Sequence, residues 1–423
     1  MRIRLAYGKT GLEVDLPEGL SVTVLEPRYQ KGLADPQAAL RQALRAPTAS
    51  RPLRELAGAA DRVGIAFSDL TRPTPYPVIL PAILAELSHV PAENILLFNA
   101  TGTHRPNTDA ELEGMLGPGI VGRYRIIQND CEDRGSHRSL GTTRSRNEVW
   151  VHGEFLDCRL KILTGFIEPH FFAGFSGGPK AVVPGLALLE TILGNHSAAH
   201  LDHPQARWGI TRGNPLWEEL REAAALAGAG FLLNVALNRD REITAVFAGD
   251  CDLAHEAGCA FVKERAMAAV REPFDIVVAS NSGYPLDLNL YQTVKGMSAA
   301  AQVVKPGGGI IVAADCWDGI PEHGFYGRLL AEARSAEELL GRLRAPGFAT
   351  RDGWQAQIHA LIVQKAQVYL YSRNLSEEQM RRALLRPCRD IAETVEALAR
   401  GSARAARVCV LPEGPQTIPY LTD

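Results

Sequence analysis

The sequence predicts an α/β protein of two domains, each a mostly parallel sheet flanked by helices, with the active site in the cleft between them. Three observations support this fold class. Short apolar runs of strand length alternate with helical segments, which is typical of parallel strands joined by covering helices. The 423 residues are enough for two domains of ordinary size. The 46% hydrophobic and 22% charged residues are typical of a globular protein.

The first part of the chain predicts a hairpin and then a strand–helix succession. Residues 1–16 alternate apolar and polar side chains around a Gly-Lys-Thr-Gly turn, and residues 30–60 have helical spacing. Thr108 and Glu111 have the spacing of a capping box at a helix start. Strands are expected at 62–68, 94–99, 123–128 and 159–164, and a helix at about 78–87.

The rest of the chain repeats the pattern, and we place the domain boundary near residue 270. The predicted domains are therefore 1–270 and 271–423. Capping boxes are expected at Ser335/Glu338 and Ser376/Gln379. Helices are expected at 215–229 and 253–270, and strands at 231–237, 242–247, 274–280, 310–314, 368–371 and 408–411.

Polar residues that could carry chemistry follow three of the predicted strands. Asp69, Arg72, His104 and His170 all stand in loops directly after a strand. In parallel sheets ligands bind outside the carboxyl ends of the strands. His104 and His170 are therefore candidates for a pair of general acid/bases.

The stretch 165–200 is the strongest candidate for a site. It holds five glycines between Gly165 and Gly185, which allow a close approach of backbone to a ligand. Lys180 ends this loop between apolar neighbours, and a desolvated lysine is a nucleophile that can bond to an electrophilic cofactor. A phosphate-binding P-loop is excluded, because Pro179 breaks its spacing and no hydroxyl follows the lysine.

The remaining histidines allow other interpretations. His196, His200 and His203 could hold zinc, but the H-E-x-x-H pattern is absent because Ser197 stands where the glutamate would be. The histidines on predicted helices are interpreted as structural or solvated; they are His89, His255 and His359.

In the second domain, one predicted helix start could clamp an anion. Gln292 and Lys295 follow the polar loop 281–289 and are three apart, so they share a helix face. The simpler interpretation is an exposed helix end; the functional one is a clamp on an anionic substrate.

Charge and composition bear on partners and compartment. The net charge of −3 gives no basic surface for nucleic acid or anionic membrane. No apolar run reaches the length of a membrane span. Seven dispersed cysteines without a C-x-x-C pair indicate reduced thiols in a cytoplasm.

Several motifs together resemble the nickel-dependent lactate racemase family, in order and over nearly the whole chain. They are FSDLTRPTPY (67–76), GTHRP (102–106), GFIEPHFFAGFSGGPKAVVPGL (165–186), NHS (195–197), DHPQAR (202–207) and YQTVKG (291–296). The resemblance implies a cytoplasmic racemase or epimerase of a small, lactate-like 2-hydroxy acid.

The resemblance also implies a cofactor and a role for each matching residue. The cofactor is a nickel-pincer nucleotide, a pyridinium-3-thioamide-5-thiocarboxylic acid mononucleotide made by dedicated biosynthesis enzymes, joined to Lys180 and holding Ni(II) with His196. His104 and His170 match the catalytic acid/bases. Arg72, Tyr291, Gln292 and Lys295 match the substrate-holding residues. Asp69 and Thr71, with Arg72, are candidates for the nucleotide's sugar and phosphate.

The implied chemistry agrees with the residues present. A carboxylate stabilises a carbanion at C2 poorly, whereas loss of hydride from C2 gives a stable 2-keto acid, and a pyridinium ring can accept hydride. Two histidines then serve the hydroxyl proton in the two directions. Two alternatives stay open: a metal-dependent hydrolase or lyase using His196, His200 and His203, and a non-catalytic organic-acid-binding protein.

Overall fold

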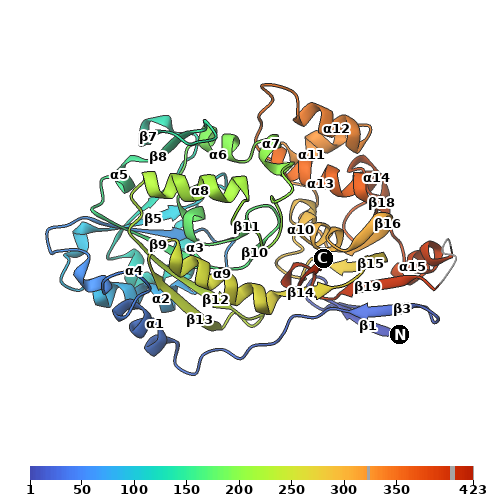
Figure 1. Cartoon of the computed structure of the whole chain (residues 1–423), viewed down its shortest axis with the longest axis horizontal. Coiled ribbons are helices and arrows are strands. Elements are labelled where there is room, and N and C mark those ends of the chain that lie inside the picture. The colour runs from blue at the N-terminus through green and yellow to red at the C-terminus, as the bar shows by residue number, and fades with distance from the viewer. Residues whose placement is uncertain (322–323, 401–404, 423) are drawn as a thin grey trace. The chain divides into compact units, whose positions relative to one another are not determined.

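The computed structural model describes residues 1–321, 324–400 and 405–422, which fold into two compact units (Figure 1). The N-terminal unit comprises Tyr29–His196 and His203–Glu264. The C-terminal unit comprises Arg265–Asp423 together with Met1–Arg28 and Ser197–Asp202. This division differs from the expected domains 1–270 and 271–423. The N-terminal residues join the other unit because a strand at Ser21–Val24 pairs with the strand Arg407–Leu411.

The N-terminal unit is built on a six-stranded sheet in which one edge strand is antiparallel and all other neighbours are parallel. In order across the sheet the strands are β13 (Ile243–Gly249), β12 (Phe231–Leu237), β9 (Leu160–Phe166), β4 (Val63–Ser68), β5 (Ile95–Ala100) and β6 (Arg125–Gln128). This confirms the predicted parallel sheet and each of its predicted strands.

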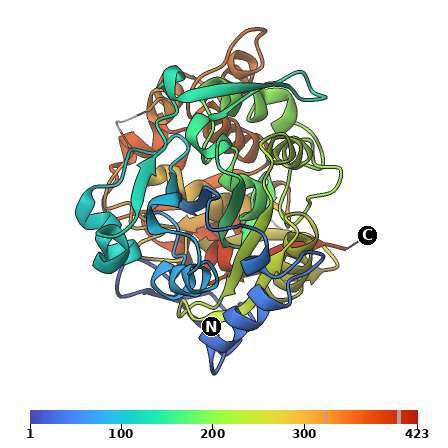
Figure 2. The same ribbon diagram turned by 90° about the vertical axis from the view of Figure 1, so that its left-hand side faces the viewer.

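Apolar side chains from both faces of this sheet are buried, as expected for strands covered by helices. Thr108 and Glu111 form the predicted reciprocal capping box of α3. Figures 1 and 2 show α1 beside the edge strand β13. The helices are α1 (Pro36–Arg45), α2 (Tyr76–Glu86), α3 (Asp109–Leu116), α4 (Pro118–Val121), α5 (Gly153–Leu156), α6 (Leu189–Asn195), α8 (Pro215–Leu226) and α9 (Leu253–Ala266). Two hairpins that the sequence did not predict complete the unit; they are β7 (His137–Thr142) with β8 (Glu148–His152), and β10 (Pro169–His170) with β11 (Gly174–Phe175).

The C-terminal unit is built on a second six-stranded sheet, whose neighbours are all parallel. In order across the sheet the strands are β18 (Arg386–Pro387), β17 (Gln367–Tyr371), β16 (Val304–Ala313), β15 (Phe274–Ser280), β19 (Arg407–Leu411) and β3 (Ser21–Val24). The predicted N-terminal hairpin is confirmed as β1 (Arg2–Leu5) and β2 (Leu12–Asp15).

The helix predicted over 253–270 ends earlier than expected, at Ala266. The next residues form β14 (Met267–Val270), which pairs with β20 (Ile418–Leu421), so sheet hydrogen bonds replace the last helical turn. The helices of the C-terminal unit are α7 (Ala198–Leu201), α10 (Leu290–Ala301), α11 (Tyr326–Ala331), α12 (Ala336–Leu343), α13 (Gly353–Lys365), α14 (Glu377–Arg382) and α15 (Ile391–Ala399). No helix among the described residues has the length and apolarity needed to span a membrane.

In each six-stranded sheet, the direction in which successive strands are added reverses at one point. This switch point positions the candidate site. In the N-terminal unit the chain runs outward from β4 through β5 to β6 and then returns to place β9 on the other side of β4. In the C-terminal unit β15 has β16 on one side and the late strand β19 on the other. Ligands of open α/β sheets bind at such switch points, outside the carboxyl ends of the strands.

Candidate active site

Three adjacent parallel strands of the N-terminal unit end in the loops that carry the predicted residues. Asp69 follows β4, His104 follows β5 and His170 follows β9. β4 is hydrogen-bonded to both β5 and β9, so these loops share one edge of the sheet at its switch point. The predicted placement of these residues after strands of one sheet is confirmed, while their roles stay predictions.

Asp69 and His104 form a close pair. His104 Nδ1 lies 2.6 Å from Asp69 Oδ2, while Thr71 donates its hydroxyl to Oδ1 at 2.8 Å. Burial raises the pKa of the Asp69 carboxyl, but the hydrogen bonds from His104 and Thr71 and the charge of Arg72 outweigh burial and hold the pKa below its usual value. An ionised Asp69 fixes the Nδ1 proton of His104 and leaves the lone pair on Nε2. Both carboxylate oxygens therefore serve a neighbouring side chain, an orienting role that the sequence did not indicate.

The His104 loop is tied to the lysine loop through the backbone. Gly102 donates its N–H to the carbonyl of Gly185 at 3.0 Å, and Gly185 donates to the carbonyl of Lys180 at 3.2 Å. Gly102 has φ +58° and lies against Pro184, a conformation that favours glycine. Two segments far apart in the chain are thereby held next to each other.

His170, Lys180 and His196 surround one aromatic ring, that of Phe172. The His170 ring centroid lies 4.5 Å from the Phe172 centroid, and the His196 centroid lies 5.1 Å away, both edge to face. Lys180 Nζ lies 5.7 Å from the same centroid. Three of the residues that the sequence singled out therefore lie close together, and each of them contacts the ring of Phe172.

Hydrogen bonds assign the tautomers of these two histidines. His196 Nδ1 lies 3.2 Å from the carbonyl of Ile192 and so carries the proton, which leaves on Nε2 the lone pair that a metal requires. Ala173 donates its N–H to His170 Nδ1 at 3.3 Å, so the proton of the neutral ring is on Nε2. Both side chains are buried, with 8% exposure each.

Lys180 lies in a short 3₁₀ turn, Gly178–Ala181, after two glycines in the left-handed region. A Cβ on Gly177 would lie 2.5 Å from Asn234 Oδ1, and one on Gly178 would lie 2.6 Å from the His255 ring. Gly178 donates its N–H to Asn234 Oδ1 at 2.8 Å. Glycine is needed at both positions because of φ and because of crowding.

His196 ends α6 and is held by the residue before it. Asn195 donates from Nδ2 to the carbonyl of Leu216 at 3.1 Å and to Glu219 Oε2 at 2.7 Å. The other oxygen of the buried Glu219 accepts hydroxyl hydrogen bonds from Thr143 and Ser145. Helix α8 thereby fixes the end of α6, a role for Glu219 that the sequence pattern did not reveal.

The C-terminal unit presents the other predicted residues on the first turns of α10. Tyr291, Gln292 and Lys295 are each partly exposed there. Asn289 caps the helix by accepting the Gln292 N–H at 3.1 Å. A Cβ on Gly296 would lie 2.6 Å from the carbonyl of Ser280, so glycine lets the helix pack closely on the end of β15.

Helix α13 orients Tyr291. Trp354 donates its indole N–H to the Tyr291 hydroxyl at 3.2 Å, and Gln355 donates to the Tyr291 carbonyl at 2.5 Å. Tyr326 packs edge to face against the Tyr291 ring, with centroids 5.3 Å apart. The Tyr291 hydroxyl oxygen therefore acts as an acceptor toward α13, and Tyr326 and Trp354 together fix the ring.

The alternative zinc cluster is not supported. His200 lies on α7, in the C-terminal unit, whereas the exposed His203 accepts the Gln205 N–H on Nδ1 in the N-terminal unit. In the described ranges, no group of three or more His, Cys, Asp or Glu side chains is arranged to hold a metal ion.

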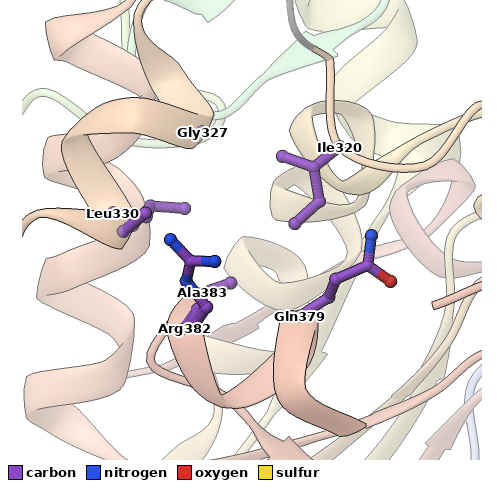
Figure 3. A pocket seen from close by; sticks show the side chains of 7 residues that line it. Ile320, Gly327, Leu330, Gln379, Arg382 and Ala383 are labelled. Atoms are coloured by element: carbon purple, nitrogen blue, oxygen red, sulfur yellow. The ribbon is translucent and has the colours of Figure 1, made fainter. Parts of the chain in front are cut away.

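One cavity of the C-terminal unit lies between α11 and α14 (Figure 3). Among its described lining residues are Leu330, Gln379 and Arg382, and none of the predicted site residues. It is therefore distinct from the candidate site.

The fold and the site together define a class of protein: a two-unit α/β protein with a lysine and paired histidines at a sheet switch point. The chain matches the family models "Lactate racemase N-terminal domain" over residues 7–209 and "Lactate racemase C-terminal domain" over residues 269–418. It belongs to the lactate racemase family and is an isomerase of the racemase class.

Two named relatives and one solved structure agree with this membership. The chain is 33% identical to the lactate racemase of Thermoanaerobacterium thermosaccharolyticum over 98% of both chains, and 37% identical to that of Lactiplantibacillus plantarum over 91% of both. The apoprotein structure of the former superposes with a TM-score of 0.92, covering 99% of this chain and 100% of that chain at 33% identity. A Thermotoga maritima protein, 18% identical, shares the fold with a TM-score of 0.70, covering 93% of this chain and 100% of its own.

Proposed function

We propose that this protein racemises lactate or a closely similar 2-hydroxy acid, using a nickel-pincer nucleotide attached to Lys180. The observation that carries the proposal is the grouping of His170, Lys180 and His196 around Phe172. The activity named for the two relatives also supports it, because they match nearly the whole chain.

The residues present fit such a group. The His196 tautomer places on Nε2 the lone pair that Ni(II) requires, and Lys180 supplies the amine for the covalent bond. The backbone at Gly177 and Gly178 has no side chain to obstruct a ligand beside that lysine. When bound, the pyridinium ring supplies a reversible acceptor for the hydride of the substrate's C2 atom.

The two acid/base histidines differ in the tautomer of the neutral ring. His104 offers the lone pair of Nε2, oriented by Asp69, and is ready to take the substrate's hydroxyl proton. His170 offers Nε2–H, a hydrogen-bond donor for the substrate's oxygen. For His170 to act as a base at Nε2, its ring proton must move to Nδ1, which requires breaking the 3.3 Å hydrogen bond from Ala173.

The resemblance assigns the substrate carboxylate and hydroxyl to Arg72, Tyr291, Gln292 and Lys295. Arg72 supplies a planar guanidinium, and Lys295 supplies an ammonium on α10. Tyr291, whose hydroxyl accepts from Trp354, would donate its own proton to a substrate oxygen, with Gln292 beside it. Thr71 stays a candidate for contact with the nucleotide, and Asp69 is assigned to the orientation of His104.

The attachment is tested by peptide mapping of protein co-expressed with the cofactor's biosynthesis enzymes. The added mass is expected on the peptide containing Lys180 and is expected to vanish in Lys180→Ala. Lys161 is the matched control, because it is buried and donates to the carbonyl of Cys158. Bound nickel should fall sharply in His196→Ala and stay unchanged in His200→Ala. An adduct on Lys161, or nickel loss only in His200→Ala, would overturn the proposal.

The chemistry is tested with substrate deuterated at C2. Because His104 and His170 exchange only the hydroxyl proton with solvent, racemisation in ordinary water should leave the C2 deuterium in place. Loss of the label at the rate of racemisation would indicate deprotonation at C2 instead. No conversion of any 2-hydroxy acid by fully loaded protein would favour the organic-acid-binding alternative.

A further inference from the structure

His255, on α9, contacts the loop that carries Lys180. Its Nε2 lies 2.8 Å from the carbonyl oxygen of Ser176, four residues before the lysine. The side chain is buried, with 3% exposure, which agrees with the structural and not the solvated interpretation of this histidine. The sequence could not reveal this contact, because Ser176 and His255 are 79 residues apart.

The surroundings of the ring fix both its orientation and its tautomer. The indole of Trp217 stacks on the His255 ring with centroids 4.8 Å apart and planes inclined by 24°. Cys259 Sγ lies 3.3 Å from Nδ1, where the thiol can donate to the ring's lone pair. Burial lowers the pKa of His255 to about 4, so the ring is neutral and Nε2 carries the proton that Ser176 accepts.

Two buried side chains thus hold the loop on either side of Gly177. His255 donates to the carbonyl of Ser176, and Asn234 accepts the N–H of Gly178. Between them the backbone is left-handed, with φ +75° at Gly177 and +55° at Gly178. This double attachment determines the direction in which the following turn presents Lys180.

We propose that His255 is a positioning residue for the covalent attachment of the cofactor at Lys180. The inference rests on the proposed function of Lys180. A neutral histidine suits the task because it donates one directed hydrogen bond and fills the space under Gly178 without bringing a charge into the core. Loss of the donor would leave the Ser176 carbonyl without its buried partner and release the loop.

The test compares His255→Phe, which keeps a ring on Trp217 but has no donor, with His255→Gln, whose amide can still reach the Ser176 carbonyl. His89→Phe is the matched control, because His89 Nε2 also bonds a backbone carbonyl, that of Ala57, at 2.8 Å. Leu44→Ala, in the fully buried core position on α1, controls for general loss of stability.

Two measurements are made on each variant. The first is hydrogen exchange of the peptide 171–181 in the apoprotein, which does not involve the cofactor. The second is the fraction of Lys180 that carries the cofactor after limited loading. His255→Phe should raise the exchange rate about tenfold and lower the loading rate about tenfold, because the buried Ser176 carbonyl has then lost its donor. His255→Gln should restore most of both, and His89→Phe and Leu44→Ala should change neither.

The outcomes separate the two proposals. Unchanged exchange and loading in His255→Phe would overturn the positioning role, as would equal losses in Leu44→Ala. If wild-type protein carries no adduct at Lys180, the proposed function fails, and exchange in the apoprotein still decides whether His255 holds the loop. If His255→Phe does not accumulate as folded protein, Cys259→Ala, which removes only the Sγ contact to Nδ1, should give a smaller rise in exchange; no rise would count against the proposal.

Discussion

At the scale of single residues, the pair Asp69–His104 decides which nitrogen of the histidine faces the substrate. We expect Asp69→Asn to lower kcat by roughly 10²–10⁴-fold, because an amide no longer holds the Nδ1 proton as a carboxylate does. Cofactor content and KM should change little. Thr71→Val removes the 2.8 Å hydrogen bond to Oδ1 but leaves the carboxylate on His104, so at equal nickel content it should lower kcat much less. Steady-state kinetics in both directions on protein of measured nickel content checks this, and equal effects of the two variants would contradict an orienting role for Asp69.

At the scale of elements, helix α8 connects the segments that carry the site. Its N-cap Asn214 donates to the carbonyl of Phe172, Trp217 stacks on His255, and Glu219 holds Asn195 beside His196. Because one rigid helix contacts all three segments, their relative positions depend on how its first turn is anchored.

Asn214→Ala tests this dependence. It removes the cap and the 2.8 Å bond to Phe172, and we expect it to lower both the free energy of unfolding, by about 1 kcal/mol or more, and nickel retention. Asp35→Ala removes the N-cap of α1, a helix that packs against β13 and α2, and should cost a similar stability without nickel loss. Urea unfolding and metal analysis measure the two effects; equal nickel retention in both variants would count against α8 as the connecting element.

At the scale of the whole molecule, buried neutral histidines make stability depend on pH. Burial lowers the pKa of His255, in the N-terminal unit, and of His359, in the C-terminal unit, to about 4 each. In the unfolded chain these two imidazoles take up a proton near pH 6.5. Between pH 6.5 and 4 the unfolded state therefore binds more protons than the folded state. The stabilisation is complete above pH 6.5 and is lost as pH falls toward 4, by at most about 3 kcal/mol for each histidine.

His359→Gln should therefore flatten the acid side of the stability curve by up to about 1.4 kcal/mol per pH unit. The comparison is His203→Gln, at an exposed position, which should leave the slope as in the wild type. Urea midpoints at pH 7.5, 6.5, 5.5 and 5 give the slopes. A His359→Gln slope equal to that of the wild type would show that this histidine does not couple folding to protons.

The sequence by itself determined the fold class, most strands of the two six-stranded sheets and the loops that carry the chemistry. It could do so because strand length, helical periodicity and turn residues are local properties, and because the carboxyl ends of parallel strands always meet at one edge. Asp69, His104 and His170 were found in this way. The glycine-rich loop singled out Lys180, and a helix start singled out Gln292 and Lys295. The family motifs added Tyr291 and the nickel role of His196, and the roles of all these residues stay predictions.

Only the tertiary structure decided which side chains hold these residues in place. The shared ring of Phe172, the carboxylate of Asp69 on His104, and the roles of Glu219 and His255 all depend on contacts between segments far apart in the chain. The same holds for Met1–Arg28, which belong to the C-terminal unit because β3 pairs with β19. A residue pattern shows which face of a helix or strand is apolar. The partner of a buried polar group, however, is set by the packing of the folded chain.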